Sequence, residues 1–254
     1  MCILMQNKIN NKKFIETCKD LIAAYKSGAL GQTKMPEDSH PDFPDKEARI
    51  AYLTLPMALN YQRNSYTLWE SALNTFKDPS TRFVFDIHIV NKKTESEVRT
   101  ALMKYKLALQ PNKHISTWRS ISKTIEREWG SFEKFTDSID NDFLKLKQTV
   151  QIDYKKGFPY LSGPKIFNYW SFILSTYGNI KLKNKDAIDI APDTHITQCS
   201  VKLGIITDKD VETMTKEKLS QLWRQTLKGS GIDPIDMHPP LWFWSRNGFI
   251  FKHD

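Results

Sequence analysis

The chain has 254 residues, 40% of them hydrophobic and 26% charged, which is ordinary for a soluble globular protein. Its 37 Lys and Arg residues exceed its 29 Asp and Glu residues, and the net charge of +8 favours a polyanionic partner, although a lysine-rich composition alone can be uninformative. Three cysteines, Cys2, Cys18 and Cys199, exclude a four-cysteine iron–sulfur cluster, and no apolar run is long enough for a signal peptide or a membrane span.

The first third of the chain shows helical periodicity with interruptions. Residues 12–27 place apolar side chains on one stripe and predict an amphipathic helix. Residues 35–45 are rich in Pro and Asp and predict an irregular connection. Residues 46–76 are helical again with a break expected at Pro56, and residues 78–81 predict a turn with a helix-capping signal.

Short helices are expected through the middle of the chain. Helical periodicity recurs over residues 94–109, 115–127, 131–136 and 139–149. Ser131 can cap the third of these helices, and Asp137 or Ser138 the fourth. Alternation over residues 82–90 and the pattern of residues 180–190 are weak local β signals. We therefore expect an all-α, or mainly α, protein with many short helices.

A Ser162-Gly163-Pro164 turn delivers Lys165 onto the start of a predicted helix. Backbone N–H groups and the positive dipole end at such a helix start can bind a phosphate without reading sequence. Gly163 permits the turn, and Pro164 suits the first helical position. A lysine nucleophile needs a pKa near 7–8 instead of about 10.4, and both the helix start and burial disfavour the ammonium form. Lys165 is therefore either a nucleophile or a solvated phosphate contact.

A second segment, Pro192-Asp193-Thr194-His195, also reads as a helix start. Asp193 can be the helix N-cap and nothing more, or a catalytic carboxylate that stabilises oxocarbenium character at a sugar. His195 can donate to a phosphate at the same helix start, or it can be structural. One amine and one carboxylate, each placed by a turn, are the groups needed to break an N-glycosidic bond by covalent catalysis.

These two segments resemble the helix-hairpin-helix DNA glycosylases, the group that includes endonuclease III and the 8-oxoguanine glycosylases. Gly163-Pro164-Lys165 is similar to the end of the family's hairpin, and Asp193-Thr194-His195 to its Asp-x-His segment, while Leu161 replaces the first glycine of the usual Gly-x-Gly. The resemblance implies that Lys165 attacks the sugar C1′ to form a Schiff base, that Asp193 assists, and that β-elimination can nick the strand. It further implies that Ser162, Gly163 and His195 contact DNA.

Two other stretches resemble the family more loosely. Residues 55–64 look like the segment that fills the gap left by a flipped base, which implies Gln62 or Asn60 as the wedge and Arg63 as a contact to the orphan base or backbone. Residues 244–252 look like the C-terminus of the archaeal-type 8-oxoguanine glycosylases, with Lys252 near the base pocket. This chain continues to His253-Asp254.

The C-terminal region is dense in aromatic residues, which usually pack a core or seal one subdomain against another. A sharper hypothesis is that some of them stack on an extruded base. Trp242, Trp244 and Phe249, together with Lys252, are the candidates for that pocket.

The resemblance implies two helical subdomains with the hairpin, residues 154–177, at their junction and a cleft between them. We expect one subdomain from residues 49–79 plus 187–254 and a central one from residues 80–186, with residues 1–48 unassigned. The expected protein is a monomer that acts on double-stranded damaged DNA, binds no membrane, and is cytoplasmic, nucleoid-associated or, in a eukaryote, nuclear. No cofactor or metal is expected to be required, although a monovalent cation at the hairpin is possible by family likeness.

The leading hypothesis is a base-excision-repair DNA glycosylase with abasic-site (AP) lyase activity, acting on an oxidised purine such as 8-oxoguanine. One alternative is a nucleoside or nucleotide N-glycosidase, which would keep Asp193 and an aromatic pocket but need no hairpin. Another is a non-catalytic DNA-binding module that uses the hairpin only for phosphate.

Overall fold

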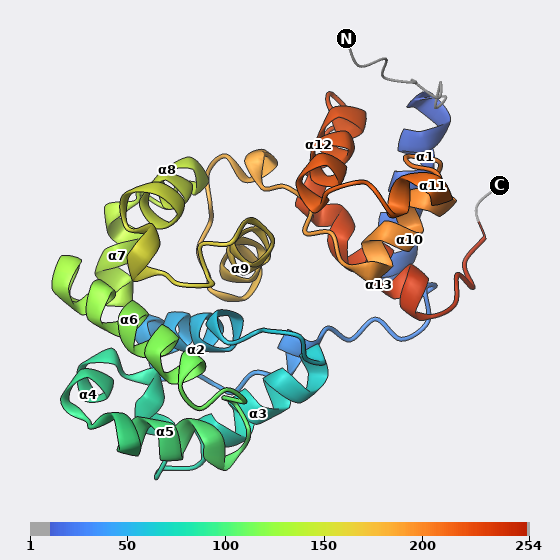
Figure 1. The fold of residues 1–254 in the computed structure, drawn as a ribbon. Coiled ribbons are helices and arrows are strands. Elements are labelled where there is room, and N and C mark those ends of the chain that lie inside the picture. Colours follow the sequence, from blue (N-terminus) through green and yellow to red (C-terminus); the bar gives the residue numbers. More distant parts are fainter. Residues whose placement is uncertain (1–10, 253–254) are drawn as a thin grey trace. The chain divides into compact units, whose positions relative to one another are not determined.

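A computed structural model describes residues 11–252 of the protein, and these are mainly α-helical, with no β-strand among them (Figure 1). Cys2 and His253-Asp254 lie outside the described residues. The chain divides into two compact units. The central unit is Met35–Lys185, and the terminal unit combines Met1–Lys34 with Asp186–Asp254.

The two units differ from the predicted subdomains in the placement of residues 49–79. We expected these residues beside the C-terminal helices, but they pack within the central unit. The cause is the apolar surface of α2 (Lys46–Ala58), whose residues from Ile50 to Ala58 are all buried. A helix that is apolar all round must be covered on every side, and α2 packs against other helices of the central unit.

The central unit contains eight α-helices. In addition to α2 they are α3 (Ser65–Lys77), α4 (Ile87–Lys92), α5 (Glu95–Lys104), α6 (Lys113–Glu128), α7 (Phe132–Ser138), α8 (Phe143–Gln148) and α9 (Pro164–Tyr177). Short 3₁₀ turns occur at Pro36–Ser39, Arg82–Phe85 and Lys155–Gly157, and a π-helical turn follows α8 at Thr149–Asp153.

Helix α9 is the main partner of α2 in the core of the central unit. Its buried face includes Phe167, Trp170 and Leu174, which recur every three or four residues as an amphipathic helix requires. The indole N–H of Trp170 donates to the hydroxyl of Thr54 on α2 at 3.1 Å, so the buried donor is satisfied. This packing holds the start of α9, and with it the lysine turn, on a rigid support.

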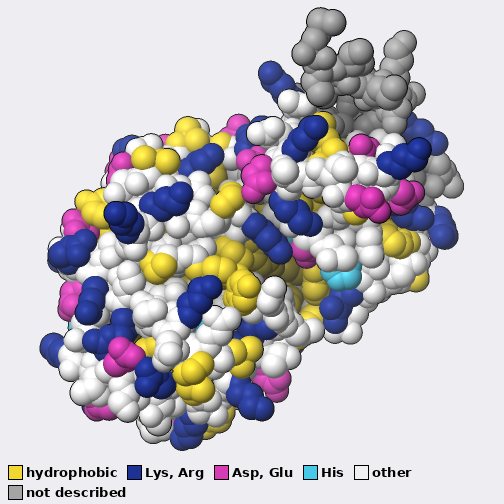
Figure 2. Space-filling model, viewed as in Figure 1, with side chains coloured by type: hydrophobic (Ala, Val, Ile, Leu, Met, Phe, Trp, Pro, Cys, Tyr) yellow, Lys and Arg dark blue, Asp and Glu magenta, His cyan; other side chains and the backbone are white. Residues whose placement is uncertain are grey.

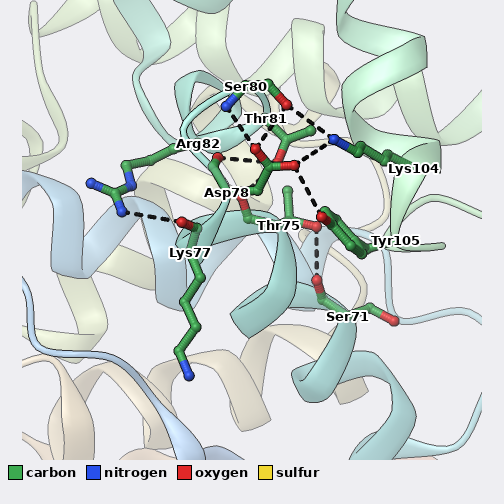
Figure 3. Close-up of polar contacts among 9 residues, drawn as sticks. All are labelled: Ser71, Thr75, Lys77, Asp78, Ser80, Thr81, Arg82, Lys104 and Tyr105. Atoms are coloured by element: carbon green, nitrogen blue, oxygen red, sulfur yellow. Dashed lines mark hydrogen bonds and ion pairs between the residues drawn. The ribbon is translucent and has the colours of Figure 1, made fainter.

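The predicted turn after α3 is present and is built around Asp78 (Figure 3). One carboxylate oxygen accepts from the N–H and hydroxyl of Ser80, both at 2.8 Å, and the other accepts from Lys104 at 2.6 Å and Tyr105 at 3.0 Å. The Lys104 ammonium and the Ser80 donors hold the pKa of Asp78 well below its usual range. One side chain thereby ties the end of α3 to the end of α5.

The weak β signal at residues 82–90 is wrong, since these residues form no strand. Arg82–Phe85 forms a 3₁₀ turn, and Asp86 then caps α4 by accepting from the N–H groups of His88 at 2.9 Å and Ile89 at 3.1 Å. The capping aspartate favours a helix over the ladder that alternation suggested. The expected ribbon at residues 180–190 is also wrong, since this stretch has one isolated bridge, from Lys183 to Asp142, and a 3₁₀ turn.

Several helix ends differ from the prediction. The break expected at Pro56 is wrong, because α2 continues through Pro56 and ends at Ala58. Helix α5 ends at Lys104 instead of continuing to residue 109; Tyr105 is its C-cap, and Lys106 adopts a positive φ of 58°. Ser131 caps α7 as predicted, but α8 is capped by Asp142 instead of Asp137 or Ser138.

The terminal unit joins the two ends of the chain into one helical core. Its helices are α1 (Asn11–Ser27), α10 (Thr194–Lys202), α11 (Asp208–Val211), α12 (Lys216–Leu227) and α13 (His238–Arg246). Helix α13 packs against both α10 and α1 (Figure 1). Aromatic residues fill the contacts, as in the stacked pair Tyr25 and Phe243, whose ring centroids are 5.8 Å apart, and the buried Trp223, which donates to Ser200 at 2.8 Å.

Candidate functional site

The turn before α9 has a specific hydrogen-bonded geometry. Ser162 donates its N–H to the carbonyl of Phe158, and Gly163 donates to the carbonyl of Tyr160, both at 3.0 Å. Gly163 is the N-cap of α9, in extended conformation and with no side chain to offer, and Pro164 takes the first helical position. A Cβ atom at Gly163 would lie 3.2 Å from the Tyr160 carbonyl oxygen, which is tighter than most real contacts. The turn therefore favours glycine, because a side chain here would need a small shift of the Tyr160 carbonyl.

The start of α9 exposes both a side-chain donor and backbone N–H donors. The side chain of Lys165, the second residue of the helix, is exposed to solvent. Within residues 11–252, no acceptor pairs with the N–H groups of Lys165 and Ile166. Two backbone donors and one amine at the positive end of a 14-residue helix make a site suited to an anion.

The predicted wedge segment lies against this turn, within the same unit. The hydroxyl of Tyr160 donates to the carbonyl oxygen of Asn60 at 2.6 Å, and the rings of Tyr160 and Tyr61 meet edge to face with centroids 5.7 Å apart. Gln62 is exposed and adopts a positive φ of 47°, which a non-glycine residue rarely does. The structure thus brings together two segments that lie about 100 residues apart in the sequence.

Arg63 differs from the free DNA contact that we expected, because its guanidinium group faces the protein. It is half-buried and donates to the carbonyl oxygen of Leu107 at 2.7 Å and to the hydroxyl of Ser71 at 3.4 Å. Burial lowers the pKa of Arg63. We conclude that Arg63 holds the 105–112 loop next to the wedge segment.

Sequence reasoning missed two residues at this loop. The buried His114 accepts the N–H of Leu109 through Nδ1 at 3.1 Å, and burial, reinforced by the charges of Arg63 and Lys113, lowers the pKa of His114 to about 4. The Lys113 amine lies 5.1 Å from the centre of the Tyr61 ring. Both follow the Pro111-Asn112 pair that precedes α6, and this pair was the only signal in the sequence.

Most carbonyl oxygens of the hairpin take part in hydrogen bonds within the chain. From Phe158 to Gly163, the carbonyl oxygen of every residue except Leu161 already accepts a hydrogen bond within the chain. A monovalent cation needs several carbonyl oxygens that converge on it. We therefore derive no step through a cation at this turn.

Asp193 belongs to the terminal unit, where it is the N-cap of α10 as predicted. One carboxylate oxygen accepts the N–H of Ile196 at 2.9 Å. No group among residues 11–252 pairs with the second oxygen, and the side chain is partly exposed. The capping bond fixes the carboxylate while one oxygen stays available for chemistry.

His195, two residues into the same segment, is tied to α13. Its Nδ1 lies 2.9 Å from the hydroxyl of Ser245, which donates to the side-chain oxygen of Gln198 at 2.6 Å. Because the single hydroxyl proton goes to Gln198, Nδ1–H of His195 is the donor to Ser245 and the neutral ring leaves Nε2 as an acceptor. Donation from Nε2 to a phosphate, as the sequence suggested, therefore requires the charged imidazolium.

The four candidates for the base pocket have different environments. Trp244 is 1% exposed and donates to the carbonyl of Phe251 at 2.9 Å, so it belongs to the core. Trp242 is half-buried between His195 and the Arg246 guanidinium, which lies 4.9 Å from its ring centre. Phe249 is also half-buried, and Lys252 is exposed.

Phe249 lines a cavity of about 640 Å³ that lies wholly in the terminal unit. Residues of α10 form much of the rest of its wall, together with residues of α11 and α12. The lining residues are Thr194, Thr197, Gln198, Val201, Lys202, Asp208, Val211, Lys216 and Phe249. The Lys202 amine lies 4.9 Å from the centre of the Phe249 ring. Sequence reasoning missed this face of α10, although its polar residues recur at helical spacing directly after Asp193.

The two catalytic candidates belong to different units. Lys165 lies in the central unit and Asp193 in the terminal unit, and each is described here within its own unit. The central unit also carries Asn60, Gln62, Arg63, Ser162 and Gly163, whereas the terminal unit carries His195 and the aromatic candidates. Each unit thus presents part of the predicted chemistry on a helix start.

No helix in the described part of the chain combines the length and apolar character needed to cross a membrane. Residues 11–252 also contain no cluster of His, Cys, Asp and Glu side chains arranged to hold a metal ion. Neither the known family models nor the curated proteins include a match to this chain.

Proposed function

We propose that this protein is a base-excision DNA glycosylase with AP lyase activity, acting on an oxidised purine such as 8-oxoguanine in duplex DNA. One observation carries the proposal: the exposed amine of Lys165 stands at a helix start whose free N–H groups suit a phosphate, in a turn bonded to the 59–64 loop. The resemblance of this turn and of the Asp193 segment to the helix-hairpin-helix DNA glycosylases supports the same function.

Phosphate binding is the first step of the proposed mechanism. The N–H groups of Lys165 and Ile166 would hold a backbone phosphate without reading sequence, as helix N-termini do. The net charge of +8 adds a sequence-independent attraction. The Lys and Arg side chains are spread over the displayed face and do not gather in a single patch (Figure 2).

Base removal would use the two candidate catalytic groups. The neutral amine of Lys165 attacks the sugar C1′, the N-glycosidic bond breaks, and the base leaves with the bonding electron pair and takes up a proton. The sugar ring opens to a Schiff base, and loss of a C2′ proton then expels the 3′ phosphate by β-elimination. The free oxygen of Asp193 would stabilise positive charge at C1′ during the first step.

The extruded base and the gap that it leaves need separate partners. Gln62 and Asn60 would fill the gap, and Trp242, Phe249 and Lys252 would contact the base or its backbone. The Phe249 cavity, at about 640 Å³, has a size typical of small-ligand sites.

Borohydride trapping on duplexes with single lesions tests the proposal. We expect a covalent adduct with 8-oxoguanine and with an abasic site, and none with undamaged DNA. Lys165→Gln should abolish trapping and leave duplex binding largely intact, whereas Lys155→Gln, which changes a lysine earlier in the hairpin, should trap normally. Trapping that persists in Lys165→Gln would assign the nucleophile to another residue.

A nucleoside or nucleotide N-glycosidase is the second candidate. The observation that favours it is the cavity on α10, which lies in the unit that carries Asp193 and involves no hairpin residue. This function predicts release of a free base from nucleosides by the wild-type protein, with no adduct on DNA. Release from duplex DNA together with inert nucleosides would eliminate it.

A further inference from the structure

Tyr160 adopts a backbone conformation that tyrosine rarely adopts. Its φ is +65°, in the left-handed region that favours glycine. Such residues persist only where the surroundings hold them, and they concentrate at functional sites. In the same cluster Gln62 has a φ of +47°, so both facing loops contain one strained residue.

Tyr160 links these two loops through both of its polar groups. Its carbonyl oxygen accepts the N–H of Gly163 at 3.0 Å and shapes the turn in front of Lys165. Its hydroxyl donates to the Asn60 carbonyl oxygen at 2.6 Å. Burial, with a smaller contribution from Tyr61, raises the pKa of Tyr160 to about 12, so the hydroxyl keeps its proton and remains a donor at working pH.

The Asn60 carbonyl, which accepts this hydrogen bond, belongs to the first residue of the Asn60–Gln62 segment. It follows the end of α2, where the N–H of Asn60 bonds to Met57 and the N–H of Tyr61 bonds to Leu59. Asn60 is therefore fixed from its N-terminal side by α2 and from the opposite side by Tyr160. Gln62, two residues later, is exposed and lies on the loop that this hydrogen bond ties to the hairpin.

We propose that Tyr160 is a positioning residue that couples phosphate binding at the hairpin to insertion of the Asn60–Gln62 segment into the duplex. This inference rests on the proposed function. The backbone N–H groups that would hold the phosphate do not involve the Tyr160 side chain, so its hydroxyl affects base extrusion and not duplex binding.

The test is Tyr160→Phe on the full-length protein, with a duplex that carries 2-aminopurine beside an abasic-site analogue. Fluorescence anisotropy gives the Kd, and 2-aminopurine emission reports unstacking at the lesion. We expect a Kd within about twofold of wild type. The emission increase on this duplex should fall about tenfold or more, because a small misplacement of a positioning group has effects of this order. On a separate duplex with 8-oxoguanine, kcat for base release should fall to the same extent with KM little changed.

Tyr177→Phe is the matched control. It removes one tyrosine hydroxyl, a donor to Asp38 at 2.8 Å, from the far end of α9. The Tyr177→Phe variant should give the same 2-aminopurine emission increase and the same kcat as wild type. Tyr160→Asn provides a second variant, since asparagine tolerates positive φ without the hydroxyl or the ring. It should lose flipping as Tyr160→Phe does, even if the two differ in melting temperature.

Three outcomes decide against the coupling. Normal emission and kcat in Tyr160→Phe would show that the hydroxyl does not position the segment. An equal loss of duplex binding and flipping would make Tyr160 a structural residue of the hairpin. A wild-type protein that binds no DNA would overturn the proposed function, and the coupling with it, and is recognised before any variant is made.

Discussion

At the scale of single residues, Asp193 combines two roles that substitutions can separate. Its carboxylate caps α10 through Ile196, and its second oxygen is free for chemistry among the described residues. Asparagine is about as good an N-cap as aspartate, whereas alanine is a poor one. The cap and the charge can therefore be removed one at a time.

We expect Asp193→Asn to keep the melting temperature and to slow base release by at least about 10²-fold, because the cap is retained and the carboxylate is lost. Asp193→Ala should be equally slow and also less stable, by about 1 kcal/mol. Single-turnover base release and thermal unfolding measure the two effects. If Asp193→Asn releases base at the wild-type rate, Asp193 is a cap and nothing more.

The sequence predicted the local backbone at the candidate site residues better than the surroundings of their side chains. The Ser-Gly-Pro turn and the Pro-Asp pair are local signals, and the structure has helix starts at both. The engagement of Arg63 with Leu107 and the burial of Trp244 depend on distant segments. No local pattern carries that information, because a side chain's partner is set by tertiary packing.

At the scale of secondary-structure elements, the Asp78 turn predicts how the central unit responds to acid. Its pKa is held below the usual range in the folded state, so the stabilisation is present above the unfolded pKa of about 3.9 and is lost as pH falls through the folded value. The Asp78→Asn variant should therefore be less stable than wild type at neutral pH. Below about pH 3 the difference in stability between the two should become smaller. Urea unfolding from pH 2 to 7 measures this, with Asp42→Asn, a change at an exposed aspartate of the same unit, as control. A pH-independent difference would contradict the assignment to charge.

Glu37, in the 3₁₀ turn Pro36–Ser39, is a carboxyl whose pKa is raised, in contrast to the lowered pKa of Asp78. This carboxyl is 1% exposed, accepts from the Tyr169 hydroxyl at 3.0 Å, and has one oxygen without a partner among the described residues. Burial raises the pKa of Glu37 to about 7. The folded state therefore binds the proton more tightly, and stability falls as pH rises from about 4.5 to 7.

Glu37→Gln should remove this pH dependence, because the neutral amide keeps an acceptor for Tyr169. Above pH 7 the variant should be more stable than wild type by up to about 3 kcal/mol, and below about pH 4.5 the two should agree. Denaturant midpoints at pH 4, 6 and 8 provide the measurement. A variant less stable than wild type at pH 8 would show that Glu37 is charged and favourably paired.

The type of a secondary-structure element could be predicted where apolar residues recur regularly over several turns. It could not be predicted where a single capping residue decides between helix and strand. Residues 12–27 gave the right helix, α1, because apolar side chains recur over four turns. Residues 82–90 misled because the apolar alternation is also compatible with helical turns around Asp86. The placement of residues 49–79 was beyond local reasoning, since α2 is apolar on all sides and shows no preferred face.

At the scale of the whole molecule, the division into units separates two parts of the proposed chemistry. The central unit is one continuous segment, Met35–Lys185, with its own core around α2 and α9, and it carries Lys165. The terminal unit needs both ends of the chain and carries Asp193. Attack on an existing abasic aldehyde needs an amine, whereas base release also needs charge stabilisation at C1′.

A fragment of residues 35–185 should therefore fold and keep one activity without the other. We expect a cooperative thermal transition, salt-dependent duplex binding, and borohydride trapping on a preformed abasic site through Lys165. The fragment should give no adduct with 8-oxoguanine, because it lacks Asp193 and the Phe249 cavity. The same fragment with Lys165→Gln is the control and should not trap. A folded fragment that fails to trap abasic DNA would place the reactive amine outside the central unit, and one without a cooperative transition would show that the unit needs the chain ends to fold.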